Sequence, residues 1–228
     1  MIRAFHFLFS DMRSDEDMFA GNERPWQIGE ARSYVETSIE AGGGVMLHES
    51  GYHSSPTLWD AFLQAHGPVA CLVEVSEPVF LSTPDRDLGC FQASRNRRLL
   101  AARTVESELR AFACDCAERV LNMCARSVAP HFRRAIEVSR RFARGHATED
   151  ELREAFVSAR GTADAQKGAT RASGEAIVGA VFAESGDGAI LAVWSALQAV
   201  KTKGASFAVQ ERKWQRDRFE RTFGSLFG

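Results

Sequence analysis

The amino-acid sequence predicts an α+β protein: a small mixed unit over residues 1–95, then an α-helical bundle over residues 96–228. The first unit contains runs of aromatic and β-branched residues, which are typical of strands. In the second, apolar residues recur every three or four positions, the period of an amphipathic helix. Residues 84–98 combine turn-forming and charged residues, so we place the boundary there.

The N-terminal unit should contain a few strands and one or two helices. We expect strands over residues 2–9, 46–53 and 69–75, with a separate short extended piece over residues 78–82. Residues 57–66 carry apolar side chains at helical spacing directly after a proline.

Three short amphipathic helices should open the C-terminal bundle. Thr104 is a plausible N-cap for the first, and Pro130 suits the first turn of the second, which Gly145 can close. The third should begin at Thr148, where the sequence Thr-Glu-Asp-Glu matches a capping box.

The end of the chain should add longer helices. Residues 190–200 are apolar on most sides, which predicts a helix at the centre of the bundle, and Gly204 should end it. The last helix carries aromatic residues among charged ones. We interpret Gly168, Gly174 and Gly179 as helix interruptions, because the lysine of a phosphate-binding loop is missing.

Bulk composition restricts the function classes. The formal net charge is −2 and the isoelectric point is about 6.3, so charge gives no reason to expect nucleic-acid or membrane binding. No run approaches the roughly 20 apolar residues that span a bilayer, and the N-terminus lacks a signal-peptide pattern. The five cysteines are irregularly spaced, which indicates reduced thiols and a cytoplasmic protein.

Three motifs carry a family resemblance. The sequence FACDCAERVL spans residues 112–121, HFRRAIEVSRRFARG spans residues 131–145, and ERKWQRDRF spans residues 211–219. Together they resemble a family of immunity proteins from bacterial polymorphic toxin systems, over residues 104–226. The resemblance implies a helical protein that binds another protein, although residues 168–188 contain more Gly and Ser than the family's Ala-rich helices.

The N-terminal unit has a second resemblance. Residues 51–55 read GYHSS, and a predicted helix and the strand sequence VACLVEVSEPV follow. This order resembles a bacterial and phage domain of unknown function, and more loosely the middle of ADP-ribosyltransferase-type folds. The latter implies that His6 or Arg3, with Tyr52 and Ser54, would hold NAD, and that Glu74 would be the catalytic acid.

The charged helices offer candidate binding residues, which are Arg133, Arg134, Arg140, Arg141, Trp214 and Arg218. Arginine and tryptophan are common interface anchors, so one hypothesis is a face for an acidic partner. The favoured interpretation of the arginines is local ion pairing, with Glu137 on the same helix and with Asp115 or Glu118 on the preceding one. For the aromatic last helix, docking on its own bundle is favoured over partner capture.

No metal or catalytic site is expected. His48 and His53 lack the further ligands that a zinc site requires, unless His66 or Cys71 folds close to them. Cys114 and Cys116 would point about 200° apart on a helix, so they cannot share a metal, and we expect Cys116 in the core.

The favoured functional hypothesis is a non-enzymatic factor that binds and neutralises another protein, either a toxin or a defence effector. It would act as an immunity or antitoxin-like protein or as a phage counter-defence inhibitor, without a cofactor. We expect no membrane or nucleic-acid partner, and self-association to a homo-oligomer is compatible with the aromatic last helix. The alternative, from a different class, is an NAD-dependent ADP-ribosyltransferase-like enzyme that uses the N-terminal unit.

Overall fold

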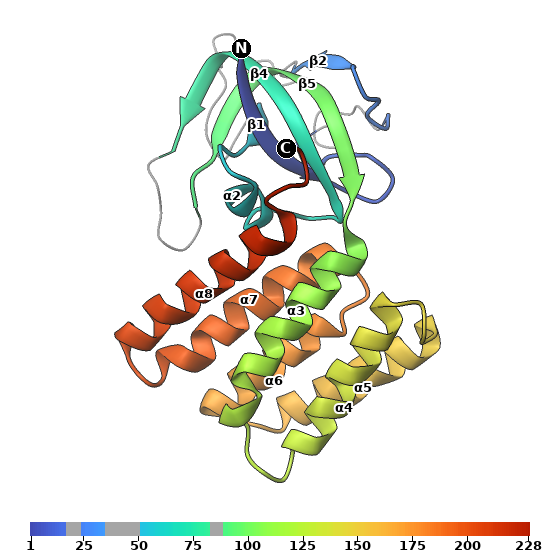
Figure 1. Cartoon of the computed structure of the whole chain (residues 1–228), viewed down its shortest axis with the longest axis vertical. Coiled ribbons are helices and arrows are strands. Elements are labelled where there is room, and N and C mark those ends of the chain that lie inside the picture. The colour runs from blue at the N-terminus through green and yellow to red at the C-terminus, as the bar shows by residue number, and fades with distance from the viewer. Residues whose placement is uncertain (17–23, 35–50, 83–88) are drawn as a thin grey trace, which may run out of the picture. The chain divides into compact units, whose positions relative to one another are not determined.

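A computed structural model of the chain describes residues 1–16, 24–34, 51–82 and 89–228 (Figure 1). The chain forms two compact units. Unit 1 comprises residues 1–105 and 223–228, and unit 2 comprises residues 106–222. The described residues form a small sheet followed by a run of helices, which confirms the predicted α+β class.

Unit 1 is built on one antiparallel sheet in the order β1-β4-β5-β2, in which β3 also pairs with β5. The strands are β1 (Ile2–Leu8), β2 (Ala31–Ser33), β3 (Tyr52–Ser54), β4 (Val69–Leu81) and β5 (Gln92–Thr104). The long strands β4 and β5 are strongly bent, as Figure 1 shows. The register of β4 shifts twice, between Leu72 and Val73 and between Ser76 and Val79, and such irregularities increase strand bending.

The bend lets the sheet close on itself. Phe5 of β1 and Ser55, just after β3, exchange two backbone hydrogen bonds of 2.8 Å. Strands β1, β4, β5 and β3 therefore form a closed circuit, and one apolar face of this circuit makes a core. The buried residues of that core are Ala4, Leu8, Trp26, Tyr52, Val69, Cys71, Val73, Val75 and Leu99.

The structure corrects three predictions for unit 1. Residues 69–75 and 78–82 belong to one strand, β4, because the irregularity near Pro78 bends the strand without ending it. Helix α2 (Leu58–Phe62) is shorter than predicted, although Thr57 caps it by accepting from the Asp60 backbone N–H. Of the strand expected over residues 46–53, the part up to residue 50 lies outside the described residues.

Strand β5 is the third difference. The predicted boundary, with its charged residues 95–98, overlaps this strand, which pairs with β2, β3 and β4. Arg97 explains the discrepancy because it is an arginine at a core-facing position, only 2% exposed. A buried arginine breaks the alternation of apolar and polar residues that identifies a strand.

Unit 2 is helical throughout its described elements. These are α3 (Glu106–Val120), the 3-10 turn η1 (Leu121–Met123), α4 (Ala129–Ala143), α5 (Glu149–Asp164), α6 (Gly168–Ala180), α7 (Ser185–Lys201) and α8 (Ala205–Phe223), whose last residue belongs to unit 1. Helix α7 packs against both α3 and α6, which fits the central position predicted for it.

The helix ends largely follow the sequence signals. Thr148 and Glu151 form the reciprocal hydrogen bonds of a capping box at the start of α5. Pro130 lies in the first turn of α4, and Gly145 has a positive φ of 72° just after that helix ends. Thr104, however, is the last residue of β5, and α3 begins at Glu106.

Glycines inside α6 and α7 allow these helices to approach closely. A Cβ atom built on Gly179 would lie 2.6 Å from the backbone nitrogen of Ala192 and from the carbonyl oxygen of Gly188. Helix α6 continues through Gly174 and Gly179, so the prediction that these two glycines interrupt a helix is wrong. Gly168 is the first residue of α6. Within the described residues, no helix is both long enough and apolar enough to cross a membrane.

Candidate functional site

Helix α4 carries most of the predicted binding residues. Phe132 and Ile136 are buried, 0% and 3% exposed, and fix one face of the helix against the bundle. Arg133, Arg134 and Arg141 are exposed on the remaining surface. Because the apolar residues recur at helical spacing, the arginines between them point outward by default.

Two of the predicted binding residues meet at one carboxylate. Arg140 forms ion pairs with Asp115 at 2.9 Å and with Glu118 at 2.7 Å. Arg218, from α8, reaches the other oxygen of Asp115 at 2.6 Å. Asp115 therefore connects α3, α4 and α8, and the ion pairing that we expected across the first two helices is confirmed.

Arg141 and Trp214 are also held within unit 2. Arg141 pairs with Glu151 at 2.8 Å and donates to the carbonyl oxygen of His146. Trp214 lies beneath the guanidinium of Arg119, whose Cζ is 4.1 Å from the ring centroid, and Arg119 in turn pairs with Glu211 at 2.9 Å. Both side chains therefore already have partners within unit 2.

Arg133 and Arg134 differ from the other four predicted binding residues. Both are exposed, and neither forms an ion pair with any residue that the structure describes. The pairing expected between Arg133 and Glu137 is not formed. Arg126 and Arg144, near the two ends of α4, are likewise exposed without an ion pair inside the described ranges.

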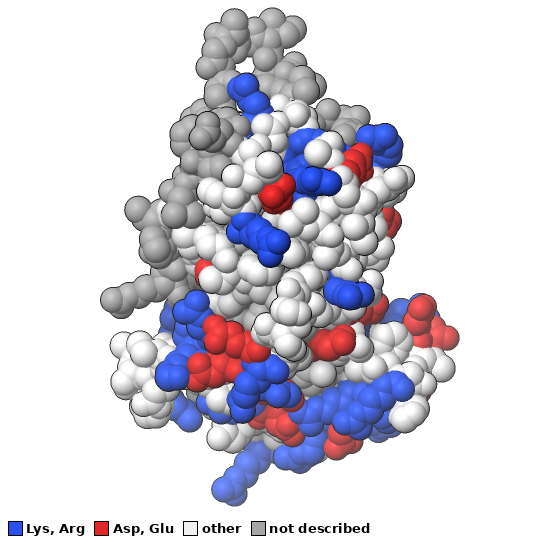
Figure 2. Space-filling view, turned by 45° about the horizontal axis from the view of Figure 1, so that its top comes forward, with Lys and Arg blue, Asp and Glu red and all other residues white. Residues whose placement is uncertain are grey.

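We call Arg126, Arg133, Arg134 and Arg144 the free arginines. On the face that Figure 2 shows, many cationic and acidic side chains lie next to one another. A paired surface arginine gains little from a new carboxylate because it must give up an existing one. An unpaired arginine gains a full charge-assisted, bidentate contact, so the free arginines are the better candidates for partner binding.

The structure brings together only part of the NAD-binding set. His6 and Ser54 line one cavity of unit 1, whereas Tyr52 is 2% exposed and lies in the core with Arg97 over its ring. Glu74 of β4 is the register partner of Arg3 in β1. Successive residues of a strand face opposite sides of the sheet, so Arg3 and Glu74 face away from His6. The proposed catalytic acid therefore lies on the opposite face of the sheet from the proposed histidine.

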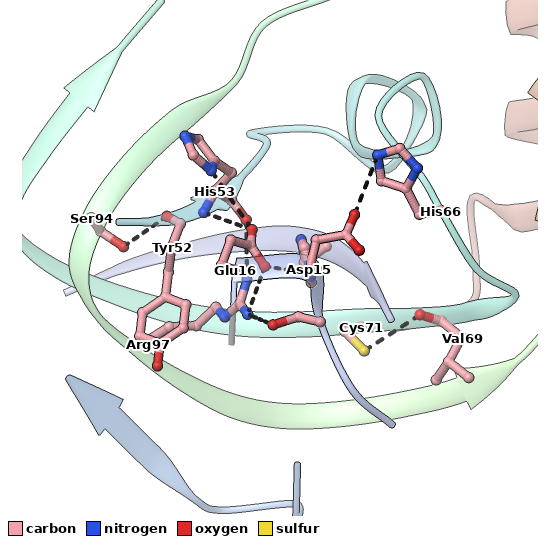
Figure 3. A network of polar contacts seen from close by, with 11 residues as sticks. Asp15, Glu16, Tyr52, His53, His66, Val69, Cys71, Ser94 and Arg97 are labelled. Carbon is pink, nitrogen blue, oxygen red and sulfur yellow. Dashed lines mark hydrogen bonds and ion pairs between the residues drawn. The ribbon is translucent and has the colours of Figure 1, made fainter. Parts of the chain in front are cut away.

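The residues that sequence reasoning missed are Glu16 and Arg97. They form a buried ion pair of 3.5 Å at the centre of a polar network that includes His53 (Figure 3). No sequence motif marks them, because they are 81 positions apart and belong to common residue types.

The thiols have structural positions. Cys114 and Cys116 are both fully buried in α3, and burial raises the pKa of each. None of the five cysteines forms a disulfide. No group of three or more metal-ligating side chains occurs within residues 1–16, 24–34, 51–82 and 89–228, and His48 lies outside these ranges.

Fold and surface together define an α+β protein whose helical unit presents a charged outer surface. A family model described as Imm-5 like putative immunity protein matches residues 100–222, just over half of the chain, and the protein belongs to that family. The match covers α3 to α8 nearly completely. Neither a curated protein nor a solved structure matches the sequence.

Proposed function

We propose that this protein binds and neutralises a toxic partner protein, and that the free arginines on and beside α4 contact an acidic surface on that partner. Membership of an immunity family supports the class of function. The observation that carries the surface assignment is the contrast between Arg133 and Arg134, which have no carboxylate partner among the described residues, and Arg140, which already has two.

The packing of α4 supports the same assignment. Its buried face includes Ser139, which donates to the carbonyl oxygen of Ala180 in α6, in addition to Phe132 and Ile136. A helix held in this way presents its arginines at fixed spacing, so binding costs little backbone ordering. Arginine also matches carboxylates in a planar, bidentate geometry, which favours an acidic target site.

A reducing compartment suits this function. All five cysteines are unpaired, and four of them are buried. We therefore place the neutralisation in the cytoplasm, where the thiols stay reduced.

The test pairs the protein with a toxic protein encoded beside it. Co-expression should restore growth, and the double variant R133A/R134A should lose this protection. In calorimetry with purified proteins, the same variant should lose at least about 2 kcal/mol of binding free energy, roughly 30-fold in Kd. Binding of the wild type should weaken as NaCl is raised, because exposed charges are screened.

The matched control is K213A/R216A, which also removes two exposed cations from one helix. Each of these cations is already paired within α8, with Asp217 and with Glu220. We expect this control to protect cells and to bind as the wild type does. Wild-type affinity in R133A/R134A would refute the surface assignment, and full protection by a chain that does not bind the toxin would refute the function.

A further inference from the structure

Unit 1 contains a cavity of about 430 Å³ that the proposed function does not use. It opens beside the junction of β1 and β3, where Phe5 bridges to Ser55. Small-molecule sites in proteins range from roughly 300 to 1,000 Å³, so this cavity has the size of a site for a small ligand.

The described cavity wall contains two carboxylates, and each lies beside a histidine: His53 Nδ1 is 3.7 Å from Glu16, and His66 Nε2 is 3.5 Å from Asp15. Lysine and arginine are absent from its described lining, and the nearby Arg97 is fully engaged. Arg97 donates to the His53 carbonyl oxygen at 3.1 Å and to the Ser14 hydroxyl at 3.2 Å, and it lies 3.5 Å from Glu16 (Figure 3). A phosphate group would therefore meet carboxylates without a compensating guanidinium.

One of the three histidines in the described wall, His6, is uncharged at neutral pH. Burial, and then the positive charge of Arg97, lower the pKa of His6 to about 3. Its Nε2 atom lies 3.8 Å from the Glu16 carboxylate, too far for a hydrogen bond. Neither this nitrogen nor the nearer Glu16 oxygen has a hydrogen-bond partner among the described residues, and such unsatisfied buried atoms call for a functional explanation.

Apart from Asp15, Glu16 and three histidines, the described lining is aromatic, small or neutral polar. Phe5 and Phe91 supply ring surfaces, and Ser54 and Gln64 supply hydrogen-bonding groups. Flat ring surfaces beside a few neutral donors and acceptors suit a flat heteroaromatic ligand with polar edges.

We propose that this cavity binds an uncharged nitrogen heterocycle, either free or attached to ribose. The aromatic wall would contact the ring, and the neutral polar side chains would bind its nitrogen and oxygen atoms. The carboxylates of Asp15 and Glu16, in a described wall without lysine or arginine, would select against phosphorylated forms of the same compound. This proposal is independent of the partner-binding surface, because every residue that carries it belongs to unit 1.

The experiment is calorimetric titration of the full chain with nicotinamide, with adenine, guanine, cytosine and uracil, and with the nucleosides of these four bases. Nicotinamide is compared with NAD, and each base and its nucleoside are compared with the corresponding 5′-monophosphate. We expect saturable binding of at least one uncharged compound and at least tenfold weaker binding of its counterpart. Binding by the free heterocycle alone, or only by the nucleoside, will distinguish the two sources of the ring. If no uncharged compound binds up to millimolar concentration, the proposal is wrong. Tighter binding of NAD than of nicotinamide would also overturn it and would favour the NAD-dependent enzyme instead.

A charge-insertion variant tests the selectivity without disturbing the core. Gln64 is exposed at the cavity wall, so Q64R should fold and should place a cation beside the site. We expect Q64R to reduce the preference for the uncharged compound over its phosphorylated counterpart by tenfold or more. The control Q27R adds the same charge at an exposed position outside the cavity and should leave the preference unchanged. Equal preferences in Q64R and Q27R would contradict the proposed site.

Discussion

Two buried arginines show how single residues organise each unit. In unit 2, Arg110 is 2% exposed and donates to the carbonyl oxygens of Phe182 at 2.7 Å and Ala183 at 2.8 Å. These carbonyls lie between α6 and α7, where helical hydrogen bonding has ended, so the guanidinium satisfies groups that would otherwise be buried without partners. In unit 1, Arg97 performs the equivalent role for the His53 carbonyl and the Glu16 carboxylate.

The residue scale also predicts a pH dependence. His6 has a pKa of about 3 in the folded protein against 6.5 for an ordinary histidine. Between these values the unfolded chain binds a proton that the folded chain does not, so the free energy of unfolding falls as the pH falls. The pKa of Glu16 acts in the same direction only at lower pH. Burial raises this pKa, but Arg97, His6 and His53 together outweigh the effect of burial and hold it well below its usual range.

We therefore expect the wild type to lose up to about 2 kcal/mol of stability through His6 between pH 6.5 and pH 5. Urea unfolding of the wild type and of His6→Gln at both pH values measures this. Because glutamine does not titrate, the variant should lose less stability over the same interval, and the other groups cancel in the comparison. If the wild type and the variant lost the same stability over this interval, His6 would take up its proton equally in the folded and unfolded chains.

At the scale of elements, the crossing of α6 and α7 depends on glycine. A Cβ at Gly188 would lie 2.5 Å from the carbonyl oxygen of Gly179, and this neighbour is backbone that cannot rotate away. The Gly-rich segment that departs from the family's Ala-rich pattern is therefore the place where two helices pack with backbone against backbone.

Gly179→Ala should destabilise the protein by about 1–3 kcal/mol, because the added methyl group forces the helices apart. The matched control is Gly161→Ala in α5, where a Cβ would have nothing within 4 Å. There alanine should stabilise the protein by about 0.5–1 kcal/mol through helix propensity. Thermal or urea unfolding monitored by circular dichroism gives both values, and equal effects of the two substitutions would disprove the close-packing argument.

At the scale of the whole molecule, the position of the domain boundary stays a prediction. The sequence suggested domains over residues 1–95 and 96–228, while the structure divides into compact units between Val105 and Glu106. The two divisions differ in β5, whose residues 96–104 pair with β4 over Val69–Ser76. A cut after residue 95 removes most of a central strand from the sheet.

Fragments should decide between the two divisions. We expect residues 1–95 to remain unfolded in circular dichroism, because β4 loses its partner over half its length. Residues 96–228 should keep the helical signal, and limited proteolysis should remove the segment before Glu106 without changing that signal. Cooperative thermal unfolding of the 1–95 fragment would place the boundary where the sequence suggested.

Local sequence signals predict the helices of this protein, whereas its sheet depends on contacts between residues far apart in the sequence. The capping box at Thr148, the proline in the first turn of α4 and the glycine after it act within a few residues, so the sequence shows them directly. Strand β5 was missed because its arginines obscure the strand pattern. Only the tertiary structure shows that one of them, Arg97, is buried against an acid that lies 81 positions earlier.

For the arginine surface of α4, too, the sequence determines one part and the tertiary structure another. The sequence alone determined that arginines cover the outer face of α4 and that its thiol-bearing neighbour α3 is buried scaffold, because helical periodicity assigns side chains to faces. Which arginines remain available was decided by the tertiary structure. Asp115 and Glu118 approach Arg140 from another helix and Arg141 finds Glu151 on α5, whereas Arg133 and Arg134 meet no carboxylate among the described residues. Ion pairing depends on distances across helices, and periodicity along one helix contains no such distances.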